Sequence, residues 1–161
     1  MADLFGLDDE RWLQHANPLS VYSRYTVLPL IIISIWSRKR LGIYSIAPLA
    51  VSLLWMFFNP RLFSKPESLD NWASKSVLGE KIWKDKESFD VGRDFIFQVR
   101  ILNLIQVLGI PPLAWGLYHL EFWPTLTGFI LLNLGKSWFL DRMVWLYQKH
   151  RDEERVEEWS N

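Results

Sequence analysis

The sequence contains no cysteine and has no excess charge of either sign. Without cysteine, disulfides, thiolate metal sites and cysteine nucleophiles are excluded, although the compartment is not fixed by that absence. Lys and Arg together number 18, as do Asp and Glu. We therefore expect no cationic surface for a polyanion, and nucleic acid is not an expected partner. Residues 1–10 are acidic and contain no apolar run, which argues against a signal or transit peptide.

The motifs of several common enzyme classes are missing as well. The chain has no GxGxxG, no HExxH and no recognisable setting for a Ser–His–Asp nucleophile. Residues 135–137 read GKS, but the preceding glycine of a phosphate-binding loop is absent. The three histidines are not expected to form a zinc site, because His119 should lie across the membrane from His15 and His150. We expect no metal ion, and the sequence identifies no cofactor.

Four apolar stretches, each bounded by charge, dominate the rest of the chain. They cover residues 25–37, 41–59, 101–120 and 122–135. No ionisable residue occurs between Arg40 and Arg61, which corresponds to roughly 30 Å of helix and is enough to cross a bilayer. These stretches indicate a membrane protein.

The first stretch is the shortest of the four. Only thirteen residues separate Arg24 from Arg38, about 20 Å of helix against a hydrocarbon core of about 30 Å. The stretch crosses if Arg24 and the basic cluster at 38–40 extend towards the headgroups. The alternative is a re-entrant hairpin with the second stretch.

The sequence thus predicts an all-α integral membrane bundle of about four transmembrane helices, arranged as two hairpins with interfacial helices. Its segments are an amphipathic N-terminal part (1–24), a first hairpin (25–59), a polar interfacial or cytoplasmic part (60–99), a second hairpin (100–147) and a charged tail (148–161). We expect the tail to be a solvated helical extension.

Three local features refine this prediction. Asp70 is expected to cap a helix over residues 71–84. Pro111 and Pro112 are expected to kink or break the third stretch. The turn at 119–124 is so short that the third and fourth stretches should form a tight hairpin.

Basic residues are distributed unevenly around the stretches. If all four cross, the termini and the central segment share one side, which holds all but three of the 18 Lys and Arg residues. The positive-inside rule then places both termini in the cytoplasm. The dense cluster Arg38, Lys39 and Arg40, in a short loop on the other side, argues for the opposite orientation.

This topology gathers the unusual polar residues on one side of the membrane. They form a candidate ligand-binding set: His15, Asn17, Arg24, Arg61, Asp70, Asn71, Glu80, Lys136, Asp141 and Arg142. The four cations would supply positive charge, and His15, Asn17 and Asn71 would orient the ligand. The alternative is that the charges on this side only orient the protein.

A second polar set should lie between the last two stretches. Arg100, Asn103 and Gln106 recur every three residues and share a helix face, as do Asn133 and Lys136. Polar groups facing lipid are costly, so the two faces should meet each other or a cavity. They provide either interhelical hydrogen bonds or a polar pocket.

Two acidic residues suggest specific partners. Asp141 is expected to pair with a basic group such as Arg24 or Arg61. Glu80 shares a helix side with Trp72 and Trp83. The indole rings beside the carboxyl would raise the pKa of Glu80 and suit it to proton transfer. The alternative is an ion pair with a nearby lysine.

Several strings resemble a known family. They are HANP (15–18), NPRLF (59–63), DNWAS with VLGE (70–80), and LGK with LDRMVWLY (134–147). Together they resemble a family of small prokaryotic multi-pass membrane proteins known only as a domain of unknown function. The resemblance implies a shared site on one membrane face and transfers no activity.

The leading hypothesis is a non-enzymatic membrane protein whose cytoplasmic-face polar cluster binds a lipid headgroup, a small anionic ligand or a partner subunit. One alternative is an accessory subunit of a larger membrane complex, or a homo-oligomer. Another is a membrane enzyme that uses His15, Glu80 or Asp141 for acid–base chemistry on a lipidic substrate.

Overall fold

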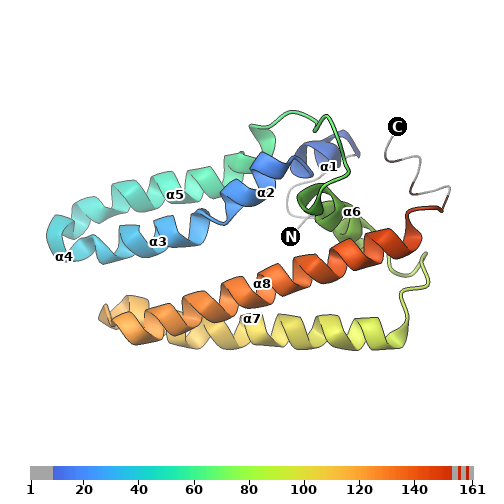
Figure 1. The fold of residues 1–161 in the computed structure, drawn as a ribbon. Coiled ribbons are helices and arrows are strands. Elements are labelled where there is room, and N and C mark those ends of the chain that lie inside the picture. Colours follow the sequence, from blue (N-terminus) through green and yellow to red (C-terminus); the bar gives the residue numbers. More distant parts are fainter. Residues whose placement is uncertain (1–8, 154–155, 157–158, 160–161) are drawn as a thin grey trace.

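The computed structural model describes residues 9–153 together with 156 and 159. Within this part of the chain every regular element is a helix, so the predicted all-α class is confirmed. Two long hairpins project in the same direction from a cap of shorter helices (Figure 1). Residues 1–8 of the expected amphipathic N-terminal segment lie outside the described residues.

The N-terminal half forms the first hairpin. Its elements are α1 (Asp9–His15), α2 (Pro18–Arg24), α3 (Val27–Trp36), α4 (Arg38–Leu41), η2 (Gly42–Ser45), α5 (Ile46–Phe58) and η3 (Asn59–Arg61). The chain reverses at Gly42, whose φ of 53° suits a residue without a side chain. Between α3 and α5, the buried hydroxyls of Ser34 and Ser52 lie 3.2 Å apart and link the two arms.

The C-terminal half contains α6 (Trp72–Lys84), α7 (Arg93–His119) and α8 (Phe122–His150). The predicted tight hairpin between α7 and α8 is present: Leu120 adopts a left-handed conformation, and the Glu121 amide donates to the Gly116 carbonyl at 2.9 Å. α7 runs unbroken through Pro111 and Pro112, so a break does not occur there. Packing along α8 supports the helix where the prolines remove backbone hydrogen bonds.

Glycines allow α8 to be approached closely on two sides. A Cβ atom on Gly128 would lie 2.5 Å from the backbone nitrogen of Leu113 in α7. A Cβ atom on Gly79 of α6 would lie 1.9 Å from the carbonyl oxygen of Met143. Neither distance leaves room for a side chain, so α6 and α7 both rest directly on the α8 backbone.

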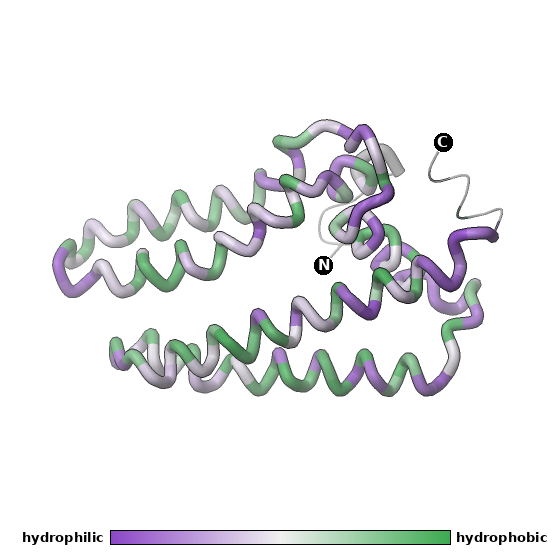
Figure 2. The backbone as a smooth tube through the Cα atoms, in the orientation of Figure 1, coloured by the Kyte–Doolittle hydropathy of each residue, from purple (hydrophilic) through white to green (hydrophobic). Residues whose placement is uncertain are grey.

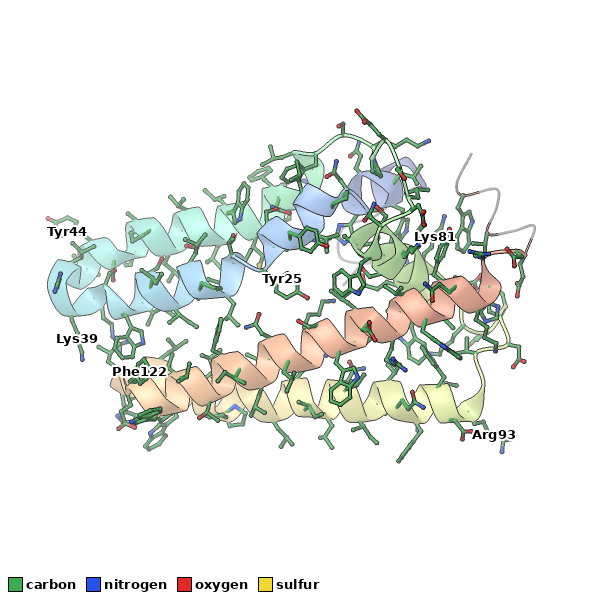
Figure 3. All side chains as sticks on the ribbon, in the orientation of Figure 1. Tyr25, Lys39, Tyr44, Lys81, Arg93 and Phe122 are labelled. Carbon is green, nitrogen blue, oxygen red and sulfur yellow. The ribbon has the colours of Figure 1, made fainter. Side chains whose placement is uncertain are left out.

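Buried apolar residues concentrate in the cap. One cluster joins α6, α7 and α8 around Ile82, Val99 and Met143, and a second joins α1, α2 and α6 around Trp12 and Val77. Along the hairpins, in contrast, apolar residues recur (Figure 2), and large apolar side chains point outward (Figure 3). The cap is therefore the part of the chain that is packed like a soluble protein.

The outward side chains accompany two helical stretches, Pro18–Phe58 and Arg93–His119, that are long and apolar enough to cross a membrane. Ile33 in the first stretch is 65% exposed, and Leu104 in the second is 56% exposed. In a soluble helix such residues would face a core. Length and composition therefore indicate membrane association.

The tips of the two hairpins are joined. Nη2 of Arg38 donates to the carbonyl oxygen of Leu117 at 2.9 Å, and the same nitrogen donates to the carbonyl oxygen of Tyr118. These carbonyls belong to the last turn of α7, where a cation suits the helix dipole. Both tips consequently lie at the end opposite the cap.

The tail differs from the expected solvated helix. α8 ends at His150, and beyond it Val156 is 2% exposed within the α6–α7–α8 core. The Trp159 ring lies 6.0 Å from the Phe89 ring and 4.0 Å from the Lys81 ammonium. Because these two apolar residues complete the core, the tail returns to the cap, and the expectation is wrong at these described positions.

Candidate functional site

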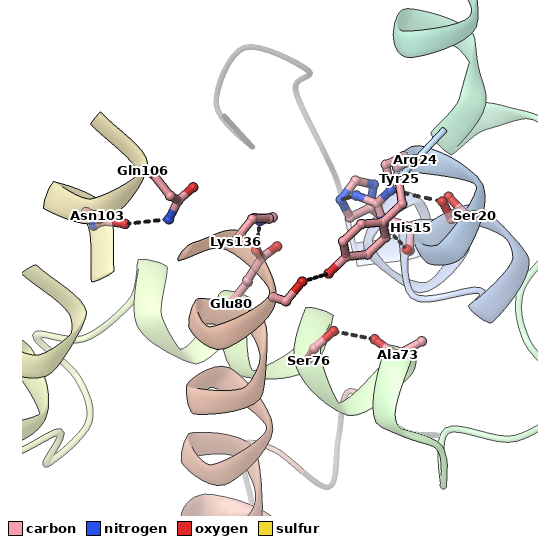
Figure 4. A network of polar contacts seen from close by, with 11 residues as sticks. His15, Ser20, Arg24, Tyr25, Ala73, Ser76, Glu80, Asn103, Gln106 and Lys136 are labelled. Carbon is pink, nitrogen blue, oxygen red and sulfur yellow. Dashed lines mark hydrogen bonds and ion pairs between the residues drawn. The ribbon is translucent and has the colours of Figure 1, made fainter. Parts of the chain in front are cut away.

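The tightest group of predicted site residues lies where α2, α6 and α8 meet (Figure 4). Arg24, the last residue of α2, extends back towards the end of α1. Its Nε donates to the Ser20 carbonyl oxygen at 3.0 Å, its Nη2 donates to the His15 carbonyl oxygen at 3.1 Å, and its Nη1 lies 2.5 Å from Nε2 of His15. A guanidinium carries five N–H groups, so two remain without a partner among the described residues.

The contact with Arg24 fixes the state of His15. A guanidinium only donates, so Nε2 of His15 must accept, and we assign the single ring proton to Nδ1. Nδ1 is buried and has no hydrogen-bond partner in the described part of the chain. Burial, together with the charges of Arg24 and Lys136, lowers the pKa of His15 to about 3. The imidazole is therefore neutral at pH 7.

Lys136 of α8 and Glu80 of α6 form an ion pair in the same region. Nζ of Lys136 donates to Oε1 of Glu80 at 2.8 Å, and the two side chains are 38% and 20% exposed. The close approach of α6 to α8 at Gly79 brings the neighbouring Glu80 within reach of α8. Glu80 thus has a lysine partner, as one alternative proposed, but the lysine lies 56 positions away rather than on the same helix.

The four residues carry more positive than negative charge. Glu80 is paired with Lys136, whereas Arg24 forms no ion pair with any described carboxylate. With His15 neutral, two cations face one anion. We call His15, Arg24, Glu80 and Lys136 the Arg24–Lys136 cluster.

Residues that the sequence reading did not assign to the site hold this cluster together. The Tyr25 hydroxyl lies 3.1 Å from the Ser137 hydroxyl and joins the first hairpin to α8. Behind Arg24, the buried Ser20 donates to Oδ1 of Asn59 at 3.3 Å, and Nδ2 of Asn59 donates to Ser23 at 2.7 Å. The position of Asn59 at the end of an apolar stretch could have marked it as a candidate site residue. Nothing in the sequence, however, indicates that Ser20 and Ser23 are its partners.

Asn17 and Asn71 use their side chains on the backbone rather than on a ligand. Oδ1 of Asn17 accepts from the Leu19 amide at 2.9 Å, and its Nδ2 donates to the Ser64 carbonyl at 2.9 Å. Oδ1 of Asn71 accepts from the Ser74 amide at 2.8 Å. The predicted helix cap at position 70 is therefore displaced by one residue, and both asparagines cap helices.

This cap gives a direct stability test. Asn71→Ala should lower the free energy of unfolding by about 1 kcal/mol, because the Ser74 amide loses its acceptor. Asp70→Ala is the matched control and should cost clearly less, since Asp70 is an exposed residue. Chemical unfolding of both variants in detergent measures the difference. Equal losses would show that Asn71 is not the cap.

Asp70 and Arg61 lie outside the Arg24–Lys136 cluster. Asp70 forms an ion pair with Lys75, whose hydrogen bond and charge lower the pKa of the Asp70 carboxyl. The Arg61 guanidinium lies 4.6 Å from the centre of the Phe57 ring. Both contacts are local, and neither residue is among the hydrogen-bond partners of Arg24.

Asp141 and Arg142 also lie apart from the cluster. Nη2 of Arg142 donates to Oδ2 of Asp141 at 3.0 Å, so the expected pairing of Asp141 with Arg24 or Arg61 is wrong. The reason is rotation along α8: residues 136 and 141 differ by about 140° around the helix axis. Lys136 can face α6 only if Asp141 turns away.

The second predicted polar set does not bridge α7 and α8. Nε2 of Gln106 donates to Oδ1 of Asn103 on the same helix at 3.4 Å, and Nδ2 of Asn133 donates to the Phe129 carbonyl on its own helix at 2.9 Å. Arg100 is exposed and forms no hydrogen bond with the described residues. A Cβ atom on Gly135 would lie 2.6 Å from Cγ of Gln106, so the Gln106 side chain packs where the two backbones come together. The predicted hydrogen bonds between the two sets are not formed among the described residues, and the polar pocket stays a prediction.

The fold and its polar cluster define a class: an all-helical protein with two stretches suited to a membrane and a charged cluster at one end of its hairpins. Among residues 9–153, 156 and 159, no three His, Asp or Glu side chains are placed to share a metal ion. The whole chain, residues 1–161, matches the model of a family described as "Family of unknown function (DUF6653)", and it belongs to that family. No curated protein and no solved structure matches it significantly.

Proposed function

We propose that the chain is a multi-pass membrane protein that binds an anionic group at the Arg24–Lys136 cluster. The ligand chemistry is a phosphate or carboxylate, carried by a lipid headgroup or a small solute. The observation that carries this proposal is the partly buried Arg24 guanidinium, which has two N–H groups without a partner and no ion pair among the described residues. The charge of Glu80 acts on Arg24 but is shared with Lys136. A bound anion would offset the cost of burying the second cation.

The proposed membrane topology has both hairpins crossing the bilayer, with the cap and both termini in the cytoplasm. α7 is about 40 Å long and exceeds a hydrocarbon core of about 30 Å. α3 alone is about 15 Å, too short to cross, but the arm from α2 to α4 extends about 36 Å. The Arg38 contacts with the end of α7 support insertion of both tips on the same side.

The enzyme alternative has less support. The Nε2 lone pair of His15 is occupied by Arg24, and its low pKa makes the imidazole a poor base at neutral pH. Glu80 is paired with Lys136, and Asp141 is exposed and paired with Arg142. None of the three is poised to exchange a proton with a substrate.

The accessory-subunit and homo-oligomer alternatives rest on outward aromatic residues. Trp115, Trp123 and Trp138 are all exposed, and either protein contacts or an interfacial aromatic belt would use them. Gentle extraction at native expression level, followed by mass spectrometry of the intact complex, separates these cases. A stoichiometric protein partner would favour the subunit hypothesis.

Two substitutions with opposite expected effects on affinity test the binding proposal. Arg24→Gln should weaken binding of short-chain phosphatidylglycerol about tenfold, because a charge-assisted hydrogen bond is lost. Glu80→Gln should strengthen binding, because Lys136 loses its competing carboxylate. Native mass spectrometry of the detergent-solubilised protein measures both affinities.

Arg61→Gln is the matched control, since it removes one exposed positive charge outside the cluster. It should leave the affinity within about twofold, as expected for a screened surface charge. The proposal fails if Arg61→Gln weakens binding as much as Arg24→Gln. It also fails if Glu80→Gln weakens binding in a protein that remains folded.

A further inference from the structure

A cavity of about 370 Å³ lies at the cap end of the second hairpin, between the start of α7 and the end of α8. α8 contributes Arg142, Trp145 and Lys149, which share one face at spacings of three and four residues. α7 contributes its first two turns, and residues 91 and 92 close one side. We call this space the α7–α8 cavity.

The charged residues that line the cavity are mainly basic. Arg93, Arg142 and Lys149 face a single acidic lining residue, Asp94. Gln98 adds a neutral amide that can donate hydrogen bonds. Asp141, outside the lining, pairs with Arg142. The cavity itself therefore has three cations against one anion.

Its basic groups retain free hydrogen-bond donors. Nη2 of Arg142 donates to Asp141, but Nε of Arg142 is buried with no partner among the described residues. Nζ of Lys149 donates to the carbonyl oxygen of Asp90 at 2.6 Å, which leaves two of its three N–H groups. Arg142 and Lys149 therefore keep further N–H groups that an acceptor in the cavity could use.

The cavity lies at the depth where headgroups would be found. The exposed apolar side chains Phe97 and Ile101 follow directly along α7, beyond the cavity from the cap. Trp145 is half-exposed at the rim and stacks on Phe95 with ring centres 5.5 Å apart. An aromatic residue between the charged cap and the apolar part of a hairpin is typical of a membrane interface.

We propose that the α7–α8 cavity binds a phosphate group, carried by an anionic lipid headgroup or free in solution. Arg142 and Lys149 would donate to the phosphate oxygens, and Arg93 would add charge at the rim. Residues 136 and 142 lie about 120° apart around α8, so this site lies on a different face from the Arg24–Lys136 cluster. It goes beyond the proposed function: it rests on the proposed membrane topology but not on anion binding at that cluster.

The test uses the full chain in detergent and counts bound short-chain phosphatidylglycerol by native mass spectrometry. The double variant Arg142→Gln/Lys149→Gln should lose one binding event, with at least a tenfold fall in affinity. Short-chain phosphatidylcholine, whose phosphate is neutralised by its own ammonium, should bind about tenfold more weakly than phosphatidylglycerol. Competition by inorganic phosphate would support the site and assign its ligand as free phosphate.

The matched control is Arg40→Gln/Arg61→Gln, which removes two exposed positive charges elsewhere. The proposal is overturned if this control loses the same binding event, or if Arg142→Gln/Lys149→Gln keeps it. If that double variant misfolds, Gln98→Glu provides the test. A carboxylate at this exposed lining position should repel the phosphate and weaken binding. An unchanged affinity would refute the site. Arg24→Gln should leave this event intact, so the two binding proposals fail separately.

Discussion

Replacing Gly79 with alanine is expected to lower the free energy of unfolding by about 2 kcal/mol. The added Cβ would lie 1.9 Å from the Met143 carbonyl oxygen and 2.5 Å from its carbonyl carbon. Those are backbone atoms of a long helix and cannot move aside singly, so overpacking should cost about 3 kcal/mol. Alanine recovers about 1 kcal/mol through its higher helix propensity. Chemical unfolding in detergent measures the net change in the free energy of unfolding.

Gly109→Ala is the control for this prediction. Its Cβ would meet the side chains of Leu131 and Leu132 at 3.0 and 3.1 Å, and the Gly128 carbonyl oxygen at 3.1 Å. These contacts require shifts of only a few tenths of an ångström, so the loss of stability should be smaller than for Gly79→Ala. A stabilising effect of Gly79→Ala would mean that α6 does not rest directly on α8.

The second large effect is expected on acidification. Because the pKa of His15 is lowered from 6.5 to about 3, the unfolded chain binds more protons than the folded chain between those values. Stability from this residue is therefore fully present above pH 6.5 and is lost as the pH falls towards 3. The slope should reach up to about 1.4 kcal/mol per pH unit.

His15→Gln isolates this contribution. The glutamine carbonyl oxygen can accept from Arg24 but does not titrate, so the variant should lose stability less steeply below pH 6.5. His119→Gln is the control for the substitution itself, because it replaces an exposed histidine at the hairpin tip, far from Arg24. Unfolding curves at pH 7, 5.5 and 4.5 provide the comparison. Parallel profiles for wild type and His15→Gln would contradict the assigned neutral imidazole.

The sequence was sufficient for features that depend on local patterns. The apolar stretches between charged residues indicate long helices, and the short link at 119–124 is compatible only with a tight turn. Asn71 shows the limit of such reasoning, since residues 70 and 71 are both good caps. Which one caps depends on where the chain enters α6.

Partner choice was not accessible from the sequence, because it depends on rotation about long helices. Each residue along α8 turns the side chain by about 100°, so a shift of one position changes which helix a residue faces. Glu80 was placed among local lysines, yet its partner is Lys136. The decisive feature is Gly79, and a glycine inside a helix does not reveal which backbone approaches it.

The Glu80–Lys136 ion pair also indicates the order in which contacts can form while the chain is being synthesised. Glu80 leaves the ribosome 56 residues before Lys136, when the first hairpin is complete and α8 does not yet exist. Within the first hairpin, Ser34 and Ser52 are only 18 positions apart and can meet early. α6 can pack against α1 and α2 before α8 has been made, but the ion pair can close only afterwards, so its closure reports completed assembly rather than early folding.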